Sequence, residues 1–416
     1  MAKGVSSINI LHTSDWHIGR SLYGRKRYDE FAAFLDWLVE TIQQQDVDVL
    51  LVAGDIFDTT TPSNRAQELY YKFLTRVAGS ACRHIVIIAG NHDSPTFLNA
   101  PKSLLRALDV HVIGAICEQP EEEVLVLNDL ADIPELIVCA VPYLRDRDIR
   151  SVEAGESIDD KEQKLINGIR QHYLDVCDLA EQKRQKLGLE IPIIAMGHLF
   201  TAGGQTIDGD GVRELYVGSL AHVTAGIFPE CIDYLALGHL HVPQKINDSE
   251  LKRYSGSPLP MGFGEAKQQK SVCLVSFDKR VATLSLINVP SFQKLQQIKG
   301  NWLDIETQII ALAVTDKKAW LEVIYDGDDV LTDLRERLEV VIADTEMELL
   351  RVKNNRIINR VLNRIDDNET LDDLNENDVF ERCLNEHKVP DEQRAELLRS
   401  YQETLTQLHE DDAHAE

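Results

Sequence analysis

Short apolar runs rich in valine and isoleucine recur along this chain, and stretches with helical periodicity separate them. The runs predict buried strands at Ile8–Leu11, Val47–Val52, Ile85–Ile88, Leu136–Val141, Ile191–Ala195 and Tyr234–Leu237. The intervening stretches predict helices at Arg27–Gln45, Gln67–Val77, Ser103–Leu108 and Asp160–Lys186. Strands that alternate with helices in this way predict an α/β fold.

Polar motifs follow most of these apolar runs directly, at the predicted carboxyl end of the strand. Open α/β sheets bind their ligands at that edge, so the motifs predict one site assembled from distant segments. They are Asp15-Trp16-His17, Gly54-Asp55-Ile56-Phe57-Asp58, Gly90-Asn91-His92-Asp93, Gly197-His198 and Gly238-His239-Leu240-His241.

The residue types in these motifs suit a pair of divalent metal ions. Hydrolysis of a phosphodiester needs an activated water and a clamp for the attacking and leaving oxygens, which two metals supply together. Carboxylates, imidazoles and an amide oxygen are appropriate ligands, and Asp55 is the natural bridge between the ions. Taken singly, a histidine at a strand end is usually a hydrogen-bonded structural residue, and a lone Asp-x-His is expected by chance. The ordered set favours the metal-site interpretation.

The five motifs together resemble the calcineurin-like metallophosphoesterases, whose pattern is D-x-H, G-D-x-x-D, G-N-H-[DE], G-H and G-H-x-H in this order. The resemblance implies a sandwich of two mixed β-sheets flanked by helices. Within that superfamily, several sequence motifs are similar to those of the bacterial double-strand-break repair nucleases. They lie at residues 12–19, 53–58, 89–94, 142–149, 236–241 and 254–258. The specific motifs span about residues 8–290.

Carried over to this chain, the resemblance implies a role for each motif residue. One metal would be held by Asp15, His17, Asp55 and His241, and the other by Asp55, Asn91, His198 and His239. The resemblance implies that His92 is a catalytic histidine that stabilises or protonates the departing 3′ oxygen, with Asp93 orienting its ring. The role of Asp58 stays open between exonuclease action and structural hydrogen bonding. The family favours Mn²⁺, although the donor set also accepts Fe²⁺, Zn²⁺ or Mg²⁺.

The length of 416 residues and the changes in element pattern and charge along the chain predict three structural parts. Residues 1–289 would form the metallophosphoesterase domain. Residues 290–353 would form a small α+β module that resembles the DNA-capping domain of these nucleases, with a purely structural role as the alternative. Its expected elements are Phe292–Ile298, Trp302–Leu312, Trp320–Tyr325, Asp329–Ile342 and Glu346–Val352, as strand, helix, strand, helix, strand.

Residues 354–416 would form a helical segment with a disordered tail at Glu410–Glu416. Helices are expected at Val379–Leu384 and Glu392–Leu408. An apolar stripe recurs there at helical spacing at Leu397, Leu398, Tyr401, Leu405 and Leu408. Such a stripe more often packs on its own domain, but the resemblance implies docking on a coiled-coil ATPase and a homodimer, giving a heterotetramer.

The net charge of −26 argues against a strongly basic nucleic-acid-binding surface. However, residues 301–416 hold 30 Asp and Glu against 13 Lys and Arg, a net −17, which leaves −9 for residues 1–300. Two basic clusters, Arg20 with Arg25, Lys26 and Arg27, and Arg145 with Arg147 and Arg150, are either phosphate contacts or salt-bridged loops. Acidity therefore lowers the expectation of tight unaided DNA binding without excluding it.

The sequence also indicates the cellular location of the protein and the redox state of its cysteines. No apolar run approaches the ~20 residues of a membrane span, and the first residues lack a secretory h-region. We therefore expect a cytoplasmic, nucleoid-associated protein. The seven cysteines are widely spaced with no CxxC pair, which predicts reduced core residues.

The resemblance implies a DNA nuclease in repair, recombination and replication. Its activities would be an ATP-dependent double-strand 3′→5′ exonuclease and a single-strand or hairpin endonuclease. Two alternatives stay open: a phosphoesterase acting on a small phosphodiester or a phosphoprotein, and a non-catalytic adaptor for DNA ends. The complete ligand set and His92 count against an adaptor.

Overall fold

The computed structural model describes residues 7–149, 157–201 and 225–354, apart from positions 248, 316–317, 328, 330 and 332. Beyond 354 it describes Phe380, Leu384, Arg394, Leu397 and Tyr401. The chain divides into two compact units, Met1–Phe292 and Gln293–Glu416. Each unit is described by itself.

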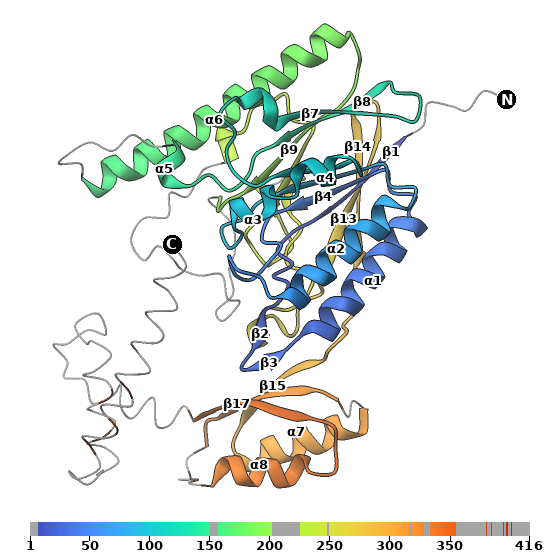
Figure 1. The fold of residues 1–416 in the computed structure, drawn as a ribbon. Coiled ribbons are helices and arrows are strands. Elements are labelled where there is room, and N and C mark those ends of the chain that lie inside the picture. The colour runs from blue at the N-terminus through green and yellow to red at the C-terminus, as the bar shows by residue number, and fades with distance from the viewer. Residues whose placement is uncertain are drawn as a thin grey trace. The chain divides into compact units, whose positions relative to one another are not determined.

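The first unit contains a six-stranded sheet with the order β14-β13-β1-β4-β5-β6. Four parallel strands, β1 (Ile8–Thr13), β4 (Val49–Ala53), β5 (His84–Ile88) and β6 (Val110–Ile113), continue into the antiparallel pair β13 (Ser271–Asp278) and β14 (Val281–Asn288). Helices α1 (Tyr28–Gln44) and α2 (Asn64–Ala78) cover one face of this sheet (Figure 1). The apolar face of α1, with Phe31, Phe34 and Leu38, is buried against the sheet.

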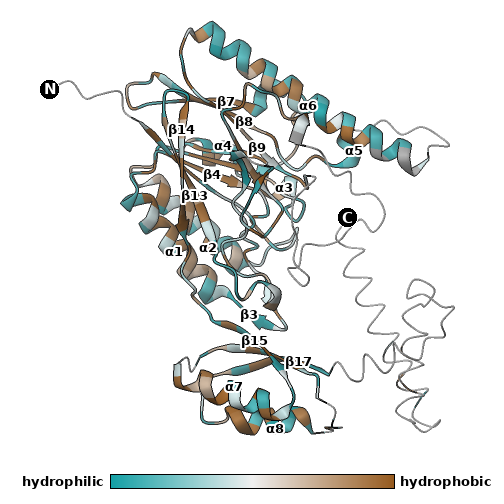
Figure 2. Ribbon diagram, turned by 180° about the vertical axis from the view of Figure 1, so that it is seen from behind, coloured by the Kyte–Doolittle hydropathy of each residue, from teal (hydrophilic) through white to brown (hydrophobic). Residues whose placement is uncertain are grey.

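A second six-stranded sheet has the order β11-β12-β10-β9-β8-β7. Strands β8 (Pro134–Ala140), β9 (Ile193–His198), β10 (Tyr234–Gly238) and β12 (Ser249–Tyr254) are parallel, and β7 (Val124–Asn128) and β11 (Gln244–Ile246) are antiparallel edge strands. The long helix α6 (Ile158–Leu187) covers the outer face (Figure 1). Figure 2 shows hydrophobic residues concentrated in the strands and hydrophilic residues along much of α6.

The two sheets pack face to face through a shared apolar core. Ile10, Val86 and Ile113 of the first sheet belong to the same buried cluster as Val138 and Tyr234 of the second. The layers are therefore helix, sheet, sheet and helix, which confirms the expected sandwich of two mixed sheets flanked by helices. Every strand and helix predicted for this unit is present, with ends shifted by a few residues.

Short elements complete the first unit. They are the hairpin β2 (Ser21–Leu22) and β3 (Arg25–Lys26), the helices α3 (Pro95–Asn99), α4 (Lys102–Arg106) and α5 (Asp146–Ile149), and the 3₁₀ turns η1 (Pro120–Glu123), η2 (Ala225–Ile227) and η3 (Phe263–Glu265). The sequence analysis did not predict the hairpin, whose strands have only two residues each, or the β13–β14 pair.

The second unit contains β15 (Leu295–Gly300), α7 (Trp302–Thr315), β16 (Trp320–Tyr325), α8 (Leu334–Ile342) and β17 (Glu348–Asn354). The predicted order of elements is confirmed, although α8 begins five residues after the expected Asp329. All three strands run parallel, so the module is a βαβαβ unit and the α+β label is wrong. Each connection is a helix long enough to return the chain to the same end of the sheet, which parallel strands require.

The predicted helices at Val379–Leu384 and Glu392–Leu408 and the acidic tail lie almost entirely outside the described residues. Of the seven cysteines, Cys383 also lies outside them, and the described six are free thiols, four of them buried. No helix in the described ranges is long and apolar enough to cross a membrane.

Candidate metal centre

The predicted ligands come together where the carboxyl ends of strands from both sheets meet. Asp15 and His17 follow β1, Asp55 follows β4 and Asn91 follows β5, all in the first sheet. The second sheet contributes His198 at the end of β9, and His239 and His241 after β10. Because β9 and β10 pair in register at Gly238 and His198, their polar ends lie side by side. The sandwich thus places seven donors from five segments at one point.

One half of the centre is formed by Asp15, His17 and His241, whose ligand atoms lie within 4.8 Å of one another. The Nε2 atoms of His17 and His241 are only 3.1 Å apart. His17 Nε2 also lies 3.5 Å from the Asp55 carboxylate. All four side chains are buried, so their donor atoms face each other in place of bulk water.

The other half is formed around Asn91. Its side-chain oxygen lies 3.0 Å from His198 Nε2 and 3.0 Å from His239 Nδ1. His198 Nε2 is also 3.3 Å from the Asp55 carboxylate. Asp55 therefore borders both halves, which is the position a bridging carboxylate requires.

Hydrogen bonding shows that this donor set fits cations. His198 Nδ1 lies 2.9 Å from the carbonyl oxygen of Ala53, to which it must donate. In the neutral ring Nε2 then carries a lone pair, yet it faces the oxygens of Asn91 and Asp55. Either a proton on Nε2 or a cation between these acceptors removes the repulsion, and the Nδ1–H to carbonyl contact is typical of metal-binding histidines.

The electrostatics of the centre lead to the same conclusion. Burial lowers the pKa of His17 to about 4 and that of His239 to about 3, so both rings are neutral and available as ligands. Burial also disfavours protonation of His198, but the carboxylates of Asp55 and Asp15 outweigh it and raise the pKa of His198 to about 9. The centre therefore holds a strongly negative potential that would attract divalent cations.

The backbone around the centre is held in an uncommon conformation. Asp15, His17, Asp55 and His239 have φ values of 54°, 47°, 50° and 102°, in a region that residues other than glycine rarely adopt. Strain of this kind persists where the surrounding structure fixes it, commonly at functional sites. Gly90 is required for close approach, because a Cβ atom there would collide with the Asp55 carboxylate.

The ring of His92 lies beside the centre, 4.9 Å from the His17 ring between centroids. Its Nδ1 is 2.9 Å from the carbonyl oxygen of Asp58, and its backbone N–H donates to the Asp55 carboxylate at 2.9 Å. The prediction that Asp93 orients this ring is wrong. The buried Asp93 carboxylate instead accepts backbone N–H groups of Ile56, Phe57 and Gly90, at 3.1, 3.0 and 2.9 Å. Asp93 thereby ties the β4 and β5 loops together.

The side chain of Asp58 takes part in a second contact at the centre. Its Oδ1 lies 3.4 Å from His17 Nδ1 and 3.3 Å from Arg20 Nη1. Burial disfavours its charged form, but His17 and Arg20 outweigh burial and lower the pKa of Asp58 to about 2. Asp58 therefore lies beside the ring of His17, and its role stays open between exonuclease action and structural hydrogen bonding.

Two further residues at the centre carried no sequence signal. Glu265 is fully buried, and its Oε1 lies 3.6 Å from His241 Nδ1. Lys270, also buried, forms an ion pair with Glu265 and donates to the carbonyl oxygen of His241 at 2.9 Å. They come from the η3 turn and the segment before β13, and only folding brings them to His241.

Comparison with known proteins agrees with this geometry. Residues 8–243 match the model of the calcineurin-like phosphoesterase family, and residues 291–388 match the family described as the type 5 capsule protein repressor C-terminal domain. The SbcD protein of the nuclease SbcCD from Escherichia coli K12 is 35% identical over 408 residues, which is 96% of this chain and 98% of that protein. The chain belongs to the SbcD family.

Other SbcD proteins match about two thirds of the chain. The SbcD protein of the Bacillus subtilis nuclease SbcCD is 36% identical over 271 residues, covering 64% of this chain and 66% of that protein. Its counterpart in Rhodobacter capsulatus is 36% identical over 276 residues, with the same shares. As a member of this family, the chain is a metal-dependent phosphoesterase of the nuclease type.

The basic clusters differ in their surroundings. Arg27 is buried and paired with Glu30 through Nε at 2.7 Å, so it is a structural residue. Arg25 and Lys26 are exposed on the β3 strand of the hairpin. In the second cluster Arg147 lies 3.6 Å from Asp148, and Arg150 is outside the described residues. Arg25 and Lys26 of the first cluster and Arg147 of the second are therefore exposed.

Proposed function

We propose that this chain is the nuclease subunit of an SbcCD-type complex and cuts DNA at the centre formed by Asp15, His17, Asp55, Asn91, His198, His239 and His241. The single observation that carries the proposal is the convergence of these donors from two sheets around Asp55. The similarity to SbcD proteins over nearly the whole chain supports DNA as the substrate and an SbcC-like coiled-coil ATPase as the partner.

The ligands would divide between two divalent ions. Asp15, His17 and His241 would hold one ion, Asn91, His198 and His239 the other, and Asp55 would bridge both. When bound, such ions activate a water and neutralise the attacking and leaving oxygens of the phosphodiester. Manganese is the proposed metal, because the donors suit it and the family favours it over Fe²⁺, Zn²⁺ or Mg²⁺, which the same donors accept.

His92 would act on the leaving group. Since its Nδ1 faces the Asp58 carbonyl, this nitrogen carries a proton and the ring orientation is fixed. In the doubly protonated ring, Nε2–H would face the departing 3′ oxygen and could stabilise or protonate it, a contribution of about 10²–10⁴-fold for general acid catalysis. Asp93 contributes indirectly by fixing the loop that carries His92.

The finer features of the proposal follow the family. They are ATP-dependent 3′→5′ exonuclease and hairpin endonuclease action in DNA repair, recombination and replication, a homodimer within a heterotetramer, and a cytoplasmic, nucleoid-associated location. Residues 290–353 would help select DNA, and residues 354–416 would dock on the ATPase. The parallel βαβαβ module supplies a separate folded platform for that selection.

The test is digestion of 5′-labelled linear duplex DNA with and without Mn²⁺, alone and with the ATPase partner, beside a chromogenic phosphodiester. We expect Mn²⁺-dependent shortening that falls by about a thousandfold or more in Asp55→Ala, since the bridging ligand is lost. Asp175→Ala, on helix α6, is the matched control and should digest DNA at the wild-type rate. Hydrolysis of the small ester alone, even with the ATPase, would show a small-substrate phosphoesterase instead.

A further inference from the structure

A second cluster of metal-binding side chains lies at the opposite end of β5 from the candidate metal centre. His84 begins β5, and His111 lies on the neighbouring strand β6. Val86 is in register with His111, and residues two apart on a strand point to the same face, so both imidazoles lie on one side of the sheet. Their ring centroids are 6.0 Å apart. The strand itself separates this cluster from Asn91 by more than about 13 Å.

Asp109 completes the cluster. One ligand atom from each of His84, Asp109 and His111 lies within 4.8 Å of the others. Asp109 has φ 56°, and its carbonyl oxygen accepts the backbone N–H of Ile85 at 3.0 Å. This bond fixes the turn before β6 against the start of β5. Among the described residues, the other groups with this geometry all contain residues of the candidate metal centre.

The hydrogen bonds of the two histidines leave lone pairs for a ligand. His84 Nε2 lies 2.8 Å from the carbonyl oxygen of Asn128 on β7, so Nε2 carries the proton and Nδ1 the lone pair. His84 Nδ1 and both ring nitrogens of His111 are buried with no hydrogen-bond partner in the described part of the chain. Buried polar atoms in this state are rare in folded proteins and call for a bound ion or water. A histidine that donates its other nitrogen to a carbonyl is typical of a metal ligand.

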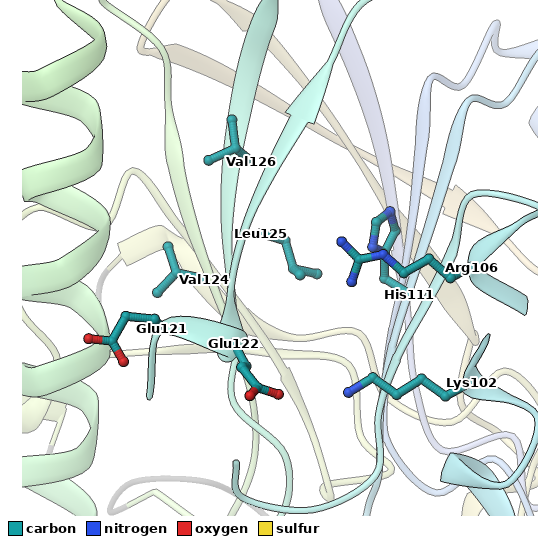
Figure 3. Close-up of a pocket in the computed structure, with 8 residues that line it drawn as sticks. All are labelled: Lys102, Arg106, His111, Glu121, Glu122, Val124, Leu125 and Val126. Atoms are coloured by element: carbon teal, nitrogen blue, oxygen red, sulfur yellow. The ribbon is translucent and has the colours of Figure 1, made fainter. Parts of the chain in front are cut away.

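The charges around the cluster are mixed. Burial, together with the nearby charge of Arg106, lowers the pKa of His111 to about 4, so its ring is neutral and available near pH 7. His111 also lines a cavity of about 370 Å³. Figure 3 shows Arg106 and Lys102 on the same side of that cavity as His111, with Glu121 and Glu122 across from them. The carboxylates offset the two cations, and the opening gives an ion and its waters access.

We propose that His84, His111 and Asp109 form a separate binding site for a divalent transition-metal ion at the open edge between the two sheets. Two imidazole nitrogens and one carboxylate oxygen suit Zn²⁺, with water completing the shell. The ion would join the start of β5 to the turn before β6 and to β6 itself. Through the His84–Asn128 hydrogen bond it would also connect to β7 of the other sheet. This site is independent of the proposed nuclease function.

The test counts Zn²⁺ ions bound to the full chain by equilibrium dialysis and metal analysis after removal of all metal. The variant His84→Gln/His111→Gln should bind one Zn²⁺ fewer per chain than the wild type, and retain the Mn²⁺-dependent activity of the wild type. His172→Gln is the matched control, because His172 is a buried histidine paired with Glu123 at 2.8 Å outside the cluster. It should bind as many ions as the wild type.

A milder variant guards against misfolding. Asp109 is exposed, so Asp109→Asn should fold normally and weaken the binding of that one ion by at least about tenfold. If the double variant and Asp109→Asn both bind Zn²⁺ with the wild-type number and affinity, the proposal is overturned. If the wild type proved to have no nuclease activity, the number of Zn²⁺ ions bound per chain would be unchanged. The two proposals can therefore fail separately.

Discussion

The carboxylate of Glu265 is the clearest case of a single residue that acts on the candidate metal centre from behind a ligand. It lies 3.6 Å from His241 Nδ1, on the far side of the ring from His17, whose Nε2 faces His241 Nε2. Lys270 holds Glu265 in the charged form, because its ammonium lowers the pKa of this carboxyl against the effect of burial. Carboxylates in this position orient a ligand imidazole and increase its basicity.

We therefore expect Glu265→Gln to weaken Mn²⁺ binding by about 10–100-fold. Titration calorimetry with Mn²⁺ on the folded variant measures the effect directly. The matched control is Glu123→Gln, which alters a buried glutamate paired with His172 away from the centre. An unchanged Mn²⁺ affinity in Glu265→Gln, or an equal loss in the control, would rule out the positioning role.

At the scale of elements, one polar contact joins the two sheets inside their shared core. His12 of β1 is fully buried and its Nδ1 lies 2.9 Å from the hydroxyl of Tyr234 on β10. Burial, together with the nearby charge of Arg253, lowers the pKa of His12 from 6.5 to about 3. The folded sandwich therefore keeps this ring neutral where the unfolded chain would protonate it.

The pKa shift of His12 gives the contact a pH dependence. Because the folded pKa is depressed, the contribution of His12 is complete above pH 6.5 and is lost as the pH falls from 6.5 towards 3. At pH 5 this amounts to about 2 kcal/mol of lost stability. Urea unfolding at pH 7 and pH 5 should show that His12→Asn loses less stability than the wild type over this interval. Equal losses in the two proteins would contradict the assignment.

At the scale of the whole molecule, the two compact units carry different parts of the proposed function. All seven proposed ligands lie in Met1–Phe292, whereas the βαβαβ module has its own buried core around Leu321, Val323 and Leu338. A ligand that binds only the folded state stabilises the unit that holds its site. Metal binding should therefore act on the first unit.

Calorimetry of the full chain tests this division. We expect two unfolding transitions, and Mn²⁺ should raise the midpoint of one of them alone, by the equivalent of about 4 kcal/mol at a thousandfold excess over Kd. Asp55→Ala should abolish the shift and keep both transitions. A single transition that moves as a whole with Mn²⁺ would show that the units unfold together.

The sequence by itself determined the chemistry of the candidate metal centre and most of the elements that carry it. Each motif follows its own strand, so both the residue types and the end of the strand can be recognised from the local sequence. Because the carboxyl ends of parallel strands share one edge of a sheet, the motifs were expected to meet there. The same reasoning predicted β16 as observed, since a buried strand has a continuous apolar run.

Only the tertiary structure decided which partner each side chain meets. The contact of Glu265 with His241, the bonds of Asp93 to the β4 loop, and the pairing of His84 with His111 all join segments distant in sequence. The parallel direction of β15, β16 and β17 is the one that alternating strands and helices favour, so the α+β label was an error of interpretation and not a gap in the sequence. Such contacts depend on how two sheets and their loops pack, and no local pattern in the sequence encodes that packing.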